Sequence, residues 1–360
     1  MRSVFKGRIS GALLLVGILA VLAAPAAQAQ PFGAWAHFSG PTHGYIEIAA
    51  SPDLNPTGAF TIEAWVSVSN NTTGEDCRSL AGKNYTQAWW IGQCNVGGQP
   101  TLRSYLGGHG SKNGGIIPRG VWTHVAVTYD GAARRHYING ELAATFPEVG
   151  ALGTSTSPMR IGSDVSWQFS PTGSIDEVRL WNVARSLAEL RANINVRIAG
   201  AQAGLVGLWR LDGSATDSVG GHGGAIGGSG VGFFTFPVTI SCGSSTTAAL
   251  CLNDRFAITT KWRTNATPGT PTDGDGHVVV AGSNSGIFWF FSSDNWEVMV
   301  KALNACGLNS RYWIFSAATT NVFYRMEVLD VRAGVQKIYF NYPGPPAPAV
   351  TDTDAFATCP

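Results

Sequence analysis

The chain has 360 residues and a formal net charge of +1, and charged residues make up only 13% of it. No basic patch or run is present, which argues against a nucleic-acid partner. Glycine occurs 45 times and tryptophan 12 times. This balance is typical of short strands joined by tight turns, with large aromatic side chains packed between sheets. The length suggests one or two domains.

The N-terminus has the pattern of a removable signal peptide. Basic residues stand at positions 2, 6 and 8, residues 12–24 are apolar, and Ala27-Gln28-Ala29 is a small-x-small cleavage site. The apolar run is shorter than the ~20 residues that a spanning helix needs. We therefore expect residues 1–29 to be removed, which changes the formal charge from +1 to −2 because three basic residues and no acidic ones are lost. The remaining chain is expected to be secreted or periplasmic, without a membrane span.

The first domain is expected over residues 30–236 and consists mainly of strands. Asn139-Gly140 is a strong turn signal, because Asn and Gly best tolerate the positive φ that both positions of a two-residue hairpin turn require. The strand candidates are residues 45–48, 60–68, 89–92, 102–106, 122–129, 135–138, 142–145, 160–162, 174–181 and 205–211.

One helix interrupts these strands. Ser186 followed by Glu189 is a capping box, and Leu187, Leu190 and Ile194 then recur on one helical face. Residues 217–230 form a glycine-rich exit from the domain. So many strand signals and so few helical ones predict two packed antiparallel sheets.

The second domain is expected over residues 237–360. Its strand candidates are residues 255–262, 277–281, 286–291, 296–303, 312–317, 323–329 and 335–340, followed by an extended proline-rich stretch at 341–350. The expected fold class is therefore all-β: an antiparallel jelly-roll sandwich followed by a second, smaller β-sandwich.

The six cysteines are expected to form disulfides. Their even number and the export signal favour this over metal ligation, and none shows a C-x-x-C spacing. In the first half, residues 84–87 form a plausible hairpin loop. If Lys83 faces Ala88 across it, the register carries Cys77 opposite Cys94, within disulfide reach.

Four cysteines in the second half allow three pairings. We expect the neighbouring ones to pair, giving Cys242–Cys251 and Cys306–Cys359. The first of these closes a short loop, and the second returns the C-terminus to the sheet.

Several motifs of the first half resemble a laminin-G-like domain of the concanavalin A-like jelly roll, the pentraxin-like lectin/glucanase superfamily. They are F-S-G-P-T-H-G-Y-I-E-I at 38–48, F-T-I-E-A-W-V at 60–66, V-W-T-H-V-A-V-T-Y-D-G at 121–131, H-Y-I-N-G-E at 136–141, G-S-I-D-E-V-R-L-W-N at 173–182 and G-L-V-G-L-W-R-L-D-G at 204–213. Their order and spacing carry the resemblance, which implies a secreted binding module.

The second half resembles a cysteine-containing C-terminal β-sandwich module of exported bacterial proteins. The resemblance rests on C-L-N-D-R-F, S-G-I-F-W-F-F, N-A-C-G-L-N-S-R-Y-W-I-F and the terminal T-D-T-D-A-F-A-T-C-P. No activity follows from it.

The laminin-G-like resemblance implies calcium as a cofactor, because members of the family often bind it at the rim of the sandwich. Asp176 matches the acid of I-D-E-V, and Asp164 follows the I-G strand as in pentraxin-like relatives. Ser39, Thr42 and His43 stand where many relatives carry aspartates, which departs from the family pattern. The alternatives are local turn hydrogen bonds for Asp164 and a structural role for Asp176.

Aromatic side chains are candidates for stacking on a sugar face. Trp167 lies in the loop beside Asp164 and Gln168, and is the leading candidate. Trp90 is adjacent to Trp89, so one of the two should face the core and the other outward. Packing is the alternative for each of these aromatics. The remaining tryptophans of this type are read as core: Trp65, Trp122, Trp181 and Trp209.

No catalytic residue is expected. A retaining glycanase needs two carboxyls ~5–5.5 Å apart. Ser174 takes the place of the first glutamate of the usual motif, and Asp176 and Glu177 are adjacent, so they point to opposite faces. Glu63 is the only carboxylate of the strand at 60–68. The leading hypothesis is a non-catalytic module that binds extracellular glycan or a cell-surface protein. The alternatives are an extracellular structural or adhesion protein and an enzyme of unrecognised type.

Overall fold

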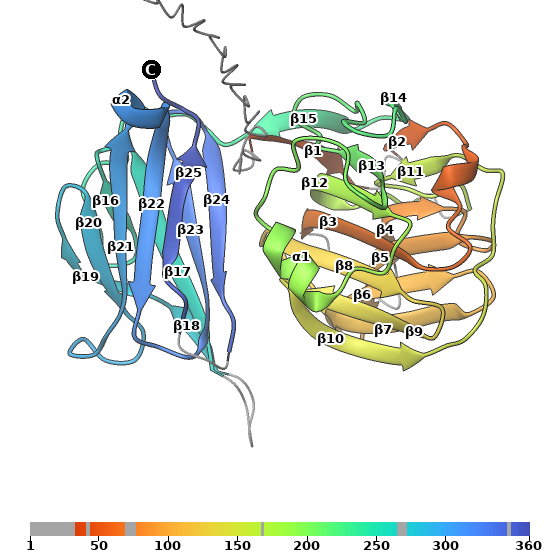
Figure 1. The fold of residues 1–360 in the computed structure, drawn as a ribbon, viewed down its shortest axis with the longest axis horizontal. Coiled ribbons are helices and arrows are strands. Elements are labelled where there is room, and N and C mark those ends of the chain that lie inside the picture. Colours follow the sequence, from red (N-terminus) through yellow and green to blue (C-terminus); the bar gives the residue numbers. More distant parts are fainter. Residues whose placement is uncertain (1–32, 41–43, 69–76, 167–168, 265–271, 344–346) are drawn as a thin grey trace, which may run out of the picture.

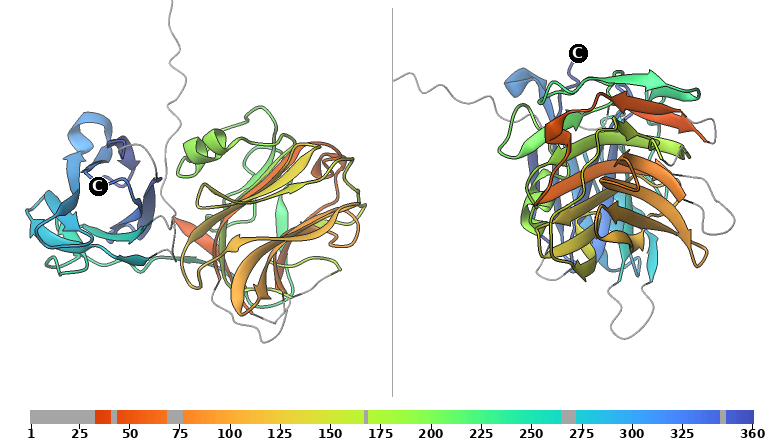
Figure 2. Two further views of the ribbon diagram at one scale, coloured as in Figure 1. Left: turned by 90° about the horizontal axis from the view of Figure 1, so that it is seen from below. Right: turned by 90° about the vertical axis from the view of Figure 1, so that its right-hand side faces the viewer.

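The computed structural model describes residues 33–40, 44–68, 77–166, 169–264, 272–343 and 347–360. The expected signal peptide at 1–29, and Trp167, Gln168, Thr42 and His43, lie outside these ranges. The described chain forms two antiparallel β-sandwiches side by side (Figures 1 and 2), as the all-β fold class predicted.

Two sheets make the first sandwich. The eight-stranded sheet has the order β10 (Glu141–Pro147), β9 (Ala133–Ile138), β8 (Thr123–Tyr129), β3 (Phe60–Val68), β12 (Thr172–Trp181), β1 (Ala34–Ser39) and β15 (Val231–Thr235), with β13 (Leu205–Trp209) paired to β12. The seven-stranded sheet has the order β14 (Gly224–Gly227), β2 (Tyr45–Ile48), β11 (Met159–Ile161), β4 (Cys77–Lys83), β5 (Trp89–Val96), β6 (Gln99–Leu106) and β7 (Gly110–Ile116). A short 3-10 turn, Pro52–Leu54, follows β2.

The second sandwich also has two sheets. One has the order β16 (Leu250–Leu252), β17 (Phe256–Arg263), β23 (Phe323–Asp330) and β24 (Val335–Asn341), with β18 (Asp273–Asp275) paired to β17. The other has the order β19 (His277–Ala281), β20 (Ser285–Trp289), β21 (Trp296–Ala305), β22 (Arg311–Ala318) and β25 (Val350–Phe356). A helical turn, α2 (Cys306–Asn309), joins β21 to β22.

The local turn and helix signals are confirmed. Asn139 and Gly140 have φ of 50° and 70°, and they join β9 to β10 with Ile138 opposite Glu141. Helix α1 (Leu187–Asn193) begins after Ser186, whose hydroxyl accepts the backbone N–H of Glu189, while the Glu189 carboxylate accepts the backbone N–H of Ser186. Leu190 of this helix is fully buried.

The three expected disulfides are present: Cys77–Cys94, Cys242–Cys251 and Cys306–Cys359. The register that led to the first pair was wrong near the loop, where Lys83 faces Trp89 rather than Ala88. A bulge between Ser79 and Ala81 absorbs the extra residue, so Cys77 still lies opposite Cys94.

The four tryptophans expected in the core are all buried, at 9% exposed or less. Only Trp209 belongs to the core between the two sheets of the first sandwich. Trp181 packs with Ile198 and Leu208, outside that core. Trp65 and Trp122 lie in a cluster with Ile338 of β24. They are therefore covered by the second sandwich.

Contacts of several kinds join the two sandwiches. The rings of Trp65 and Phe340 stack at 6.0 Å and 13°. The Arg325 guanidinium donates to the backbone oxygen of Trp122, and Arg191 lies 3.8 Å from the centre of the Tyr342 ring. Side-chain contacts, an aromatic stack and two arginine contacts, therefore join the two sandwiches in addition to the connecting chain.

Within the described ranges, no helix has the length and apolar character needed to cross a membrane.

Candidate functional site

The candidate site is built around the turn at residues 84–88, between β4 and β5. Asp164, in the loop after β11, holds this turn. Its carboxylate accepts the backbone N–H groups of Asn84 at 2.9 Å, Tyr85 at 3.0 Å and Ser166 at 2.8 Å, and the residue is fully buried. The described contacts thus give Asp164 the turn-forming role named above as the alternative to ligand contact.

Trp90 lies beside Asp164 on the outer face of the seven-stranded sheet. A Cβ placed on Gly82 would come within 2.7 Å of both the Trp90 ring and the Asp164 carboxylate, and one placed on Gly92 would lie 2.2 Å from the ring. Both glycines are therefore needed for the indole to lie flat on the sheet. The indole N–H donates to the Ser79 hydroxyl at 2.8 Å.

Trp89 and Trp90 point to opposite faces of the sheet, as their adjacency predicted, but the outward ring is not exposed. Trp89 faces the core and Trp90 the outer face, but each is only 1% exposed. Trp90 is covered by Tyr85 and Tyr105 and by the Cys77–Cys94 disulfide. A sugar could not stack on the Trp90 ring without moving these residues.

Tyr85 and Tyr105 are partly exposed and form the outermost layer of this cluster. We call Tyr85, Tyr105 and the Trp90 beneath them the tyrosine face. Tyr85 meets Trp90 edge-on at 5.1 Å and 84°, and the two tyrosine rings are 4.9 Å apart and tilted by 41°. The Tyr105 hydroxyl donates to the backbone oxygen of Thr86, and the Tyr85 hydroxyl lies 3.1 Å from that of Ser111. Both rings are therefore held in fixed orientations.

Polar groups flank the tyrosine face. Arg103 on β6 faces Gly92, donates to the Asn113 amide oxygen at 2.6 Å and contacts the sulfur of Cys77. A hollow of about 450 Å³ lies on the other side of the turn. Its lining consists of hydroxyls, amides and small apolar groups without a charged side chain: Ala50, Ser51, Pro52, Asn55, Gln87, Thr154, Ser155 and Thr156. The turn thus separates an aromatic surface from a polar, uncharged one.

Trp167 and Gln168 lie outside the described residues, and only the residues on either side of them are described here. Asp164 before them is held under the turn at 84–88. Phe169 after them is 39% exposed, accepts the backbone N–H of Ser79 and has the Arg78 guanidinium 5.2 Å from its ring centre.

Asp176 lies elsewhere, on β12 of the other sheet, opposite Trp65. It is 1% exposed, and its Oδ1 has no hydrogen-bond partner. Burial raises the pKa of Asp176 well above its usual value, with further contributions from Glu177 and Asp212. The structure does not bring Asp164 and Asp176 together.

No group of three or more His, Cys, Asp or Glu residues able to hold a metal ion occurs in the part of the chain that the structure describes. The two aspartates do not fit a shared calcium site, because one carboxylate is taken up by three N–H donors and the other lies in a different sheet. Calcium stays a prediction for a binding assay.

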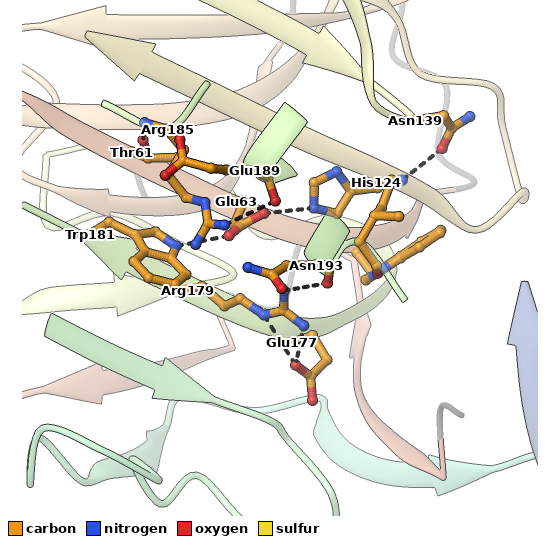
Figure 3. A network of polar contacts seen from close by, with 12 residues as sticks. Thr61, Glu63, His124, Asn139, Glu177, Arg179, Trp181, Arg185, Glu189 and Asn193 are labelled. Atoms are coloured by element: carbon orange, nitrogen blue, oxygen red, sulfur yellow. Dashed lines mark hydrogen bonds and ion pairs between the residues drawn. The ribbon is translucent and has the colours of Figure 1, made fainter. Parts of the chain in front are cut away.

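Glu63, the carboxylate of β3, lies in a buried polar network (Figure 3). One oxygen accepts the indole N–H of Trp181 at 2.8 Å, and the other lies 3.1 Å from the His124 ring. Burial by itself would raise the pKa of Glu63, but the hydrogen bond from His124 and the charges of Arg179 and His124 lower it to about 2. Glu63 is fully buried, so its present role is to join strands.

Sequence reasoning missed the two tyrosines. Tyr85 falls in the predicted loop and Tyr105 in the predicted strand at 102–106. Tyr105 pairs directly with Trp90, so the signal that could have found it was the register between β5 and β6. That register depends on where the turn at residues 97–98 begins. The apolar pattern of the two flanking strands does not indicate this position.

Comparison with known proteins gives one family. Residues 40–191 match the Laminin_G_3 model, described as the concanavalin A-like lectin/glucanases superfamily. A search of curated proteins found no significant match.

Several solved structures are similar. A protein from Bacteroides ovatus, described provisionally as carbohydrate binding, is 23% identical with a TM-score of 0.46; the match covers 57% of this chain and 60% of that one. A SAP-like pentraxin from Limulus polyphemus is 15% identical with a TM-score of 0.38, covering 56% and 95%. The sialidase module CBM40 from Ruminococcus gnavus, bound to sialyllactose, is 18% identical with a TM-score of 0.34, covering 44% and 95%. Values in this range say nothing about which ligand this chain binds.

Proposed function

Residues 40–191 match the concanavalin A-like lectin/glucanases superfamily, and on this premise we propose that the first sandwich is a non-catalytic module that binds extracellular carbohydrate. The tyrosine face carries the proposal. Sugar rings have flat apolar faces that pack on aromatic rings, while neighbouring polar groups orient the hydroxyls. Tyr85 and Tyr105 supply the rings, and Arg103 and Asn113 supply donors and acceptors beside them.

Rigidity supports a binding role for this surface. The turn that carries Tyr85 is held from below by Asp164 through two of its backbone N–H groups, and the strands beneath are joined by the Cys77–Cys94 disulfide. A surface already fixed in its binding geometry loses little conformational entropy on association. The uncharged hollow beside Gln87 adds hydroxyl and amide groups next to the same turn.

The proposed module is non-catalytic because two candidate carboxyl groups are buried. Glu63 and Asp176 are at most 1% exposed, and a general acid must reach within hydrogen-bond distance of the bond that it cleaves. Export to an oxidising compartment, secreted or periplasmic, is part of the proposal and is supported by the three disulfides.

The test is a binding screen against glycans and polysaccharides, run on the purified mature protein with calcium and again with a chelator. Replacing both Tyr85 and Tyr105 by Ala is expected to weaken binding at least about tenfold, since an aromatic contact contributes about 0.5–1.5 kcal/mol beyond area burial. The matched control replaces both by Phe, which keeps the rings and should retain most of the affinity.

Each other result has a defined meaning. Binding that survives the double Ala replacement in a folded protein would move the site away from the tyrosine face. Loss of binding with the chelator would establish calcium assistance. Release of shorter glycans by the purified protein would contradict a non-catalytic role.

Adhesion through protein–protein contacts is the second candidate. The observation that favours it is the exposure of four large apolar side chains of the second sandwich: Phe291, Trp296, Met299 and Leu308 are 48%, 51%, 41% and 78% exposed. Large exposed apolar side chains are found at interaction sites when they form a contiguous patch. A pull-down from cell-envelope proteins that survives the tyrosine replacements and free sugar would support it.

A further inference from the structure

A buried lysine and an aspartate bridge the two sheets of the second sandwich. Lys337 lies on β24 and Asp352 on β25, and each strand is the last of its sheet among the described strands. Val335 and Tyr339, which alternate with Lys337 along β24, pack against the core of this sandwich. Lys337 therefore points inward at the sheet edge, where a charged side chain is rarely found.

The amine and the carboxyl are in direct contact. Lys337 Nζ contacts Asp352 Oδ2, and the side chains are 3% and 16% exposed. The Tyr339 hydroxyl donates to the same oxygen at 2.9 Å. The backbone N–H of Asp354 donates to Oδ1 of Asp352 at 3.1 Å. Hydrogen-bond donors thus polarise both oxygens of a carboxyl group that touches a primary amine.

Burial favours the uncharged amine of Lys337. Burial lowers the pKa of Lys337, although the charges of Asp352 and Asp354 oppose this change. Burial also raises the pKa of Tyr339 well above its usual value, so its hydroxyl stays a donor. An uncharged amine is nucleophilic, and a lysine desolvated in an apolar site is one way in which proteins activate it.

We propose that Lys337 and Asp352 join in an intramolecular isopeptide bond. A proton passes from the ammonium to the carboxylate within the contact. The proton goes to Oδ2, the oxygen that Lys337 and Tyr339 contact. The Nζ lone pair then attacks Cγ of Asp352, and the backbone N–H of Asp354 donates its hydrogen bond to Oδ1, the oxygen on which negative charge develops. A further proton moves from Nζ to the hydroxyl oxygen, the Cγ–O bond breaks and one water molecule leaves. The product is an amide with one N–H, and no oxidant or cofactor is consumed.

The geometry provides what this condensation needs. The reacting groups are already in contact, so they do not have to be brought together. Asp352 keeps part of its side chain exposed, which gives the released water a way out. The bond would close the side of the sandwich between β24 and β25, in the same domain as Cys242–Cys251 and Cys306–Cys359.

Trypsin digestion of the denatured, reduced and alkylated protein tests the proposal. Arg332 and Lys337 are the last two cleavage sites of the chain, because residues 338–360 contain no Lys or Arg. With the bond, the C-terminal product is one peptide, 333–360, uncut at Lys337 and lighter by one water. Cleavage of the wild-type protein into 333–337 and 338–360 would overturn the proposal, leaving an ordinary ion pair.

Two controls make the result specific. Lys261 and Asp275 form a Lys–Asp contact in the same sandwich with exposed side chains, 57% and 63%, so cleavage after Lys261 should be complete in the same digest. Lys337→Arg keeps the charge and the trypsin site, but its guanidinium stays protonated and does not attack. This variant and Asp352→Ala are expected to be cut at position 337 and to lack the loss of water. The wild-type digest decides the matter even if either variant fails to fold.

Discussion

Three buried carboxyl groups of the first sandwich are each accommodated in a different way. Asp164 accepts three backbone N–H groups, Glu63 is charged and paired with His124 and Trp181, and Asp176 has a strongly raised pKa and an unpartnered oxygen. A buried carboxyl must either find donors or take up a proton. Which of these occurs depends on partners that come from distant strands.

His136 on β9 is a buried titratable group with a measurable consequence. It is fully buried, and its Nε2 lies 2.7 Å from the Ser104 hydroxyl. Burial, with a smaller contribution from Arg134, lowers the pKa of His136 to about 3. Because this folded-state pKa is below that of the unfolded chain, the stabilisation is complete above about pH 6.5 and is lost as the pH falls toward 3.

We expect His136 alone to reduce the free energy of unfolding by about 2 kcal/mol between pH 6.5 and pH 5, since the unfolded chain takes up a proton that the folded chain refuses. Urea unfolding of the wild type and His136→Gln at several pH values measures this. The variant should show a shallower pH dependence than the wild type. Equal slopes for wild type and His136→Gln would contradict the assignment.

For single residues, the sequence predicted which positions lie at the candidate site better than it predicted what each side chain does there. It identified Asp164 and Trp90, which the structure brings together above Gly82. It did not show that both are buried, because burial of an outward-facing side chain depends on what covers it. Tyr85 and Tyr105 cover Trp90, and they come from a turn and from a neighbouring strand.

The hairpin β4–β5 is the element that decides the shape of the candidate site. Trp90 lies flat only because Gly82 and Gly92 have no side chains, and the disulfide and the bulge set the register around it. The tyrosine face is therefore built on a sheet surface whose glycines are as important as its aromatic residues.

We expect Gly92→Ala to destabilise the first sandwich by about 1–3 kcal/mol, since the added methyl group would overlap the Trp90 ring and force it off the sheet. Thermal unfolding measures the loss, and the glycan screen reads the displaced tyrosine face. Gly58→Ala is the matched control, because a Cβ at Gly58 meets no atom within 4 Å and such surface changes stay within about 0.5 kcal/mol. Equal stability of the two variants would show that Trp90 does not need the flat surface.

Elements with a strong local sequence signal were predictable, and strands held mainly by main-chain hydrogen bonds were not. The β9–β10 turn and helix α1 each have a local signal, Asn139-Gly140 and the Ser186–Glu189 box, and both appeared as expected. In the first sandwich, β1, β7, β14 and β15 were missed. The last three are outermost described strands of their sheets, and β7 and β14 are rich in glycine. Such strands are held by main-chain hydrogen bonds on one side, so their sequences need little apolar pattern.

At the scale of the whole molecule, the junction joins the two sandwiches through side chains. Trp65 belongs to the first sandwich but is buried by Phe340 and Ile338 of the second. An ion pair between Glu141 and Arg263 lies at the same junction. Sequence patterns read Trp65 as an internal core residue, because they report that a side chain is buried but not which domain buries it.

We expect the wild-type protein to unfold in one calorimetric transition and Phe340→Ala to unfold in two, since the variant removes the ring that stacks on Trp65. Phe315→Ala, a partly exposed phenylalanine of β22, is the control and should keep a single transition. Two separated transitions in the wild type would show that the junction does not couple the sandwiches.

The position of β1 affects the order in which the strands of the first sandwich fold. Ala36 pairs with Ile175 on one side and with Phe233 on the other, so the first described strand lies between two strands that are made much later. Pairings so distant in sequence slow folding, because a long loop must close before they form. During synthesis, Trp35 and Phe38 must wait without strand partners until nearly the whole first sandwich has emerged. We therefore expect β1 to be among the last strands of the first sandwich to be placed.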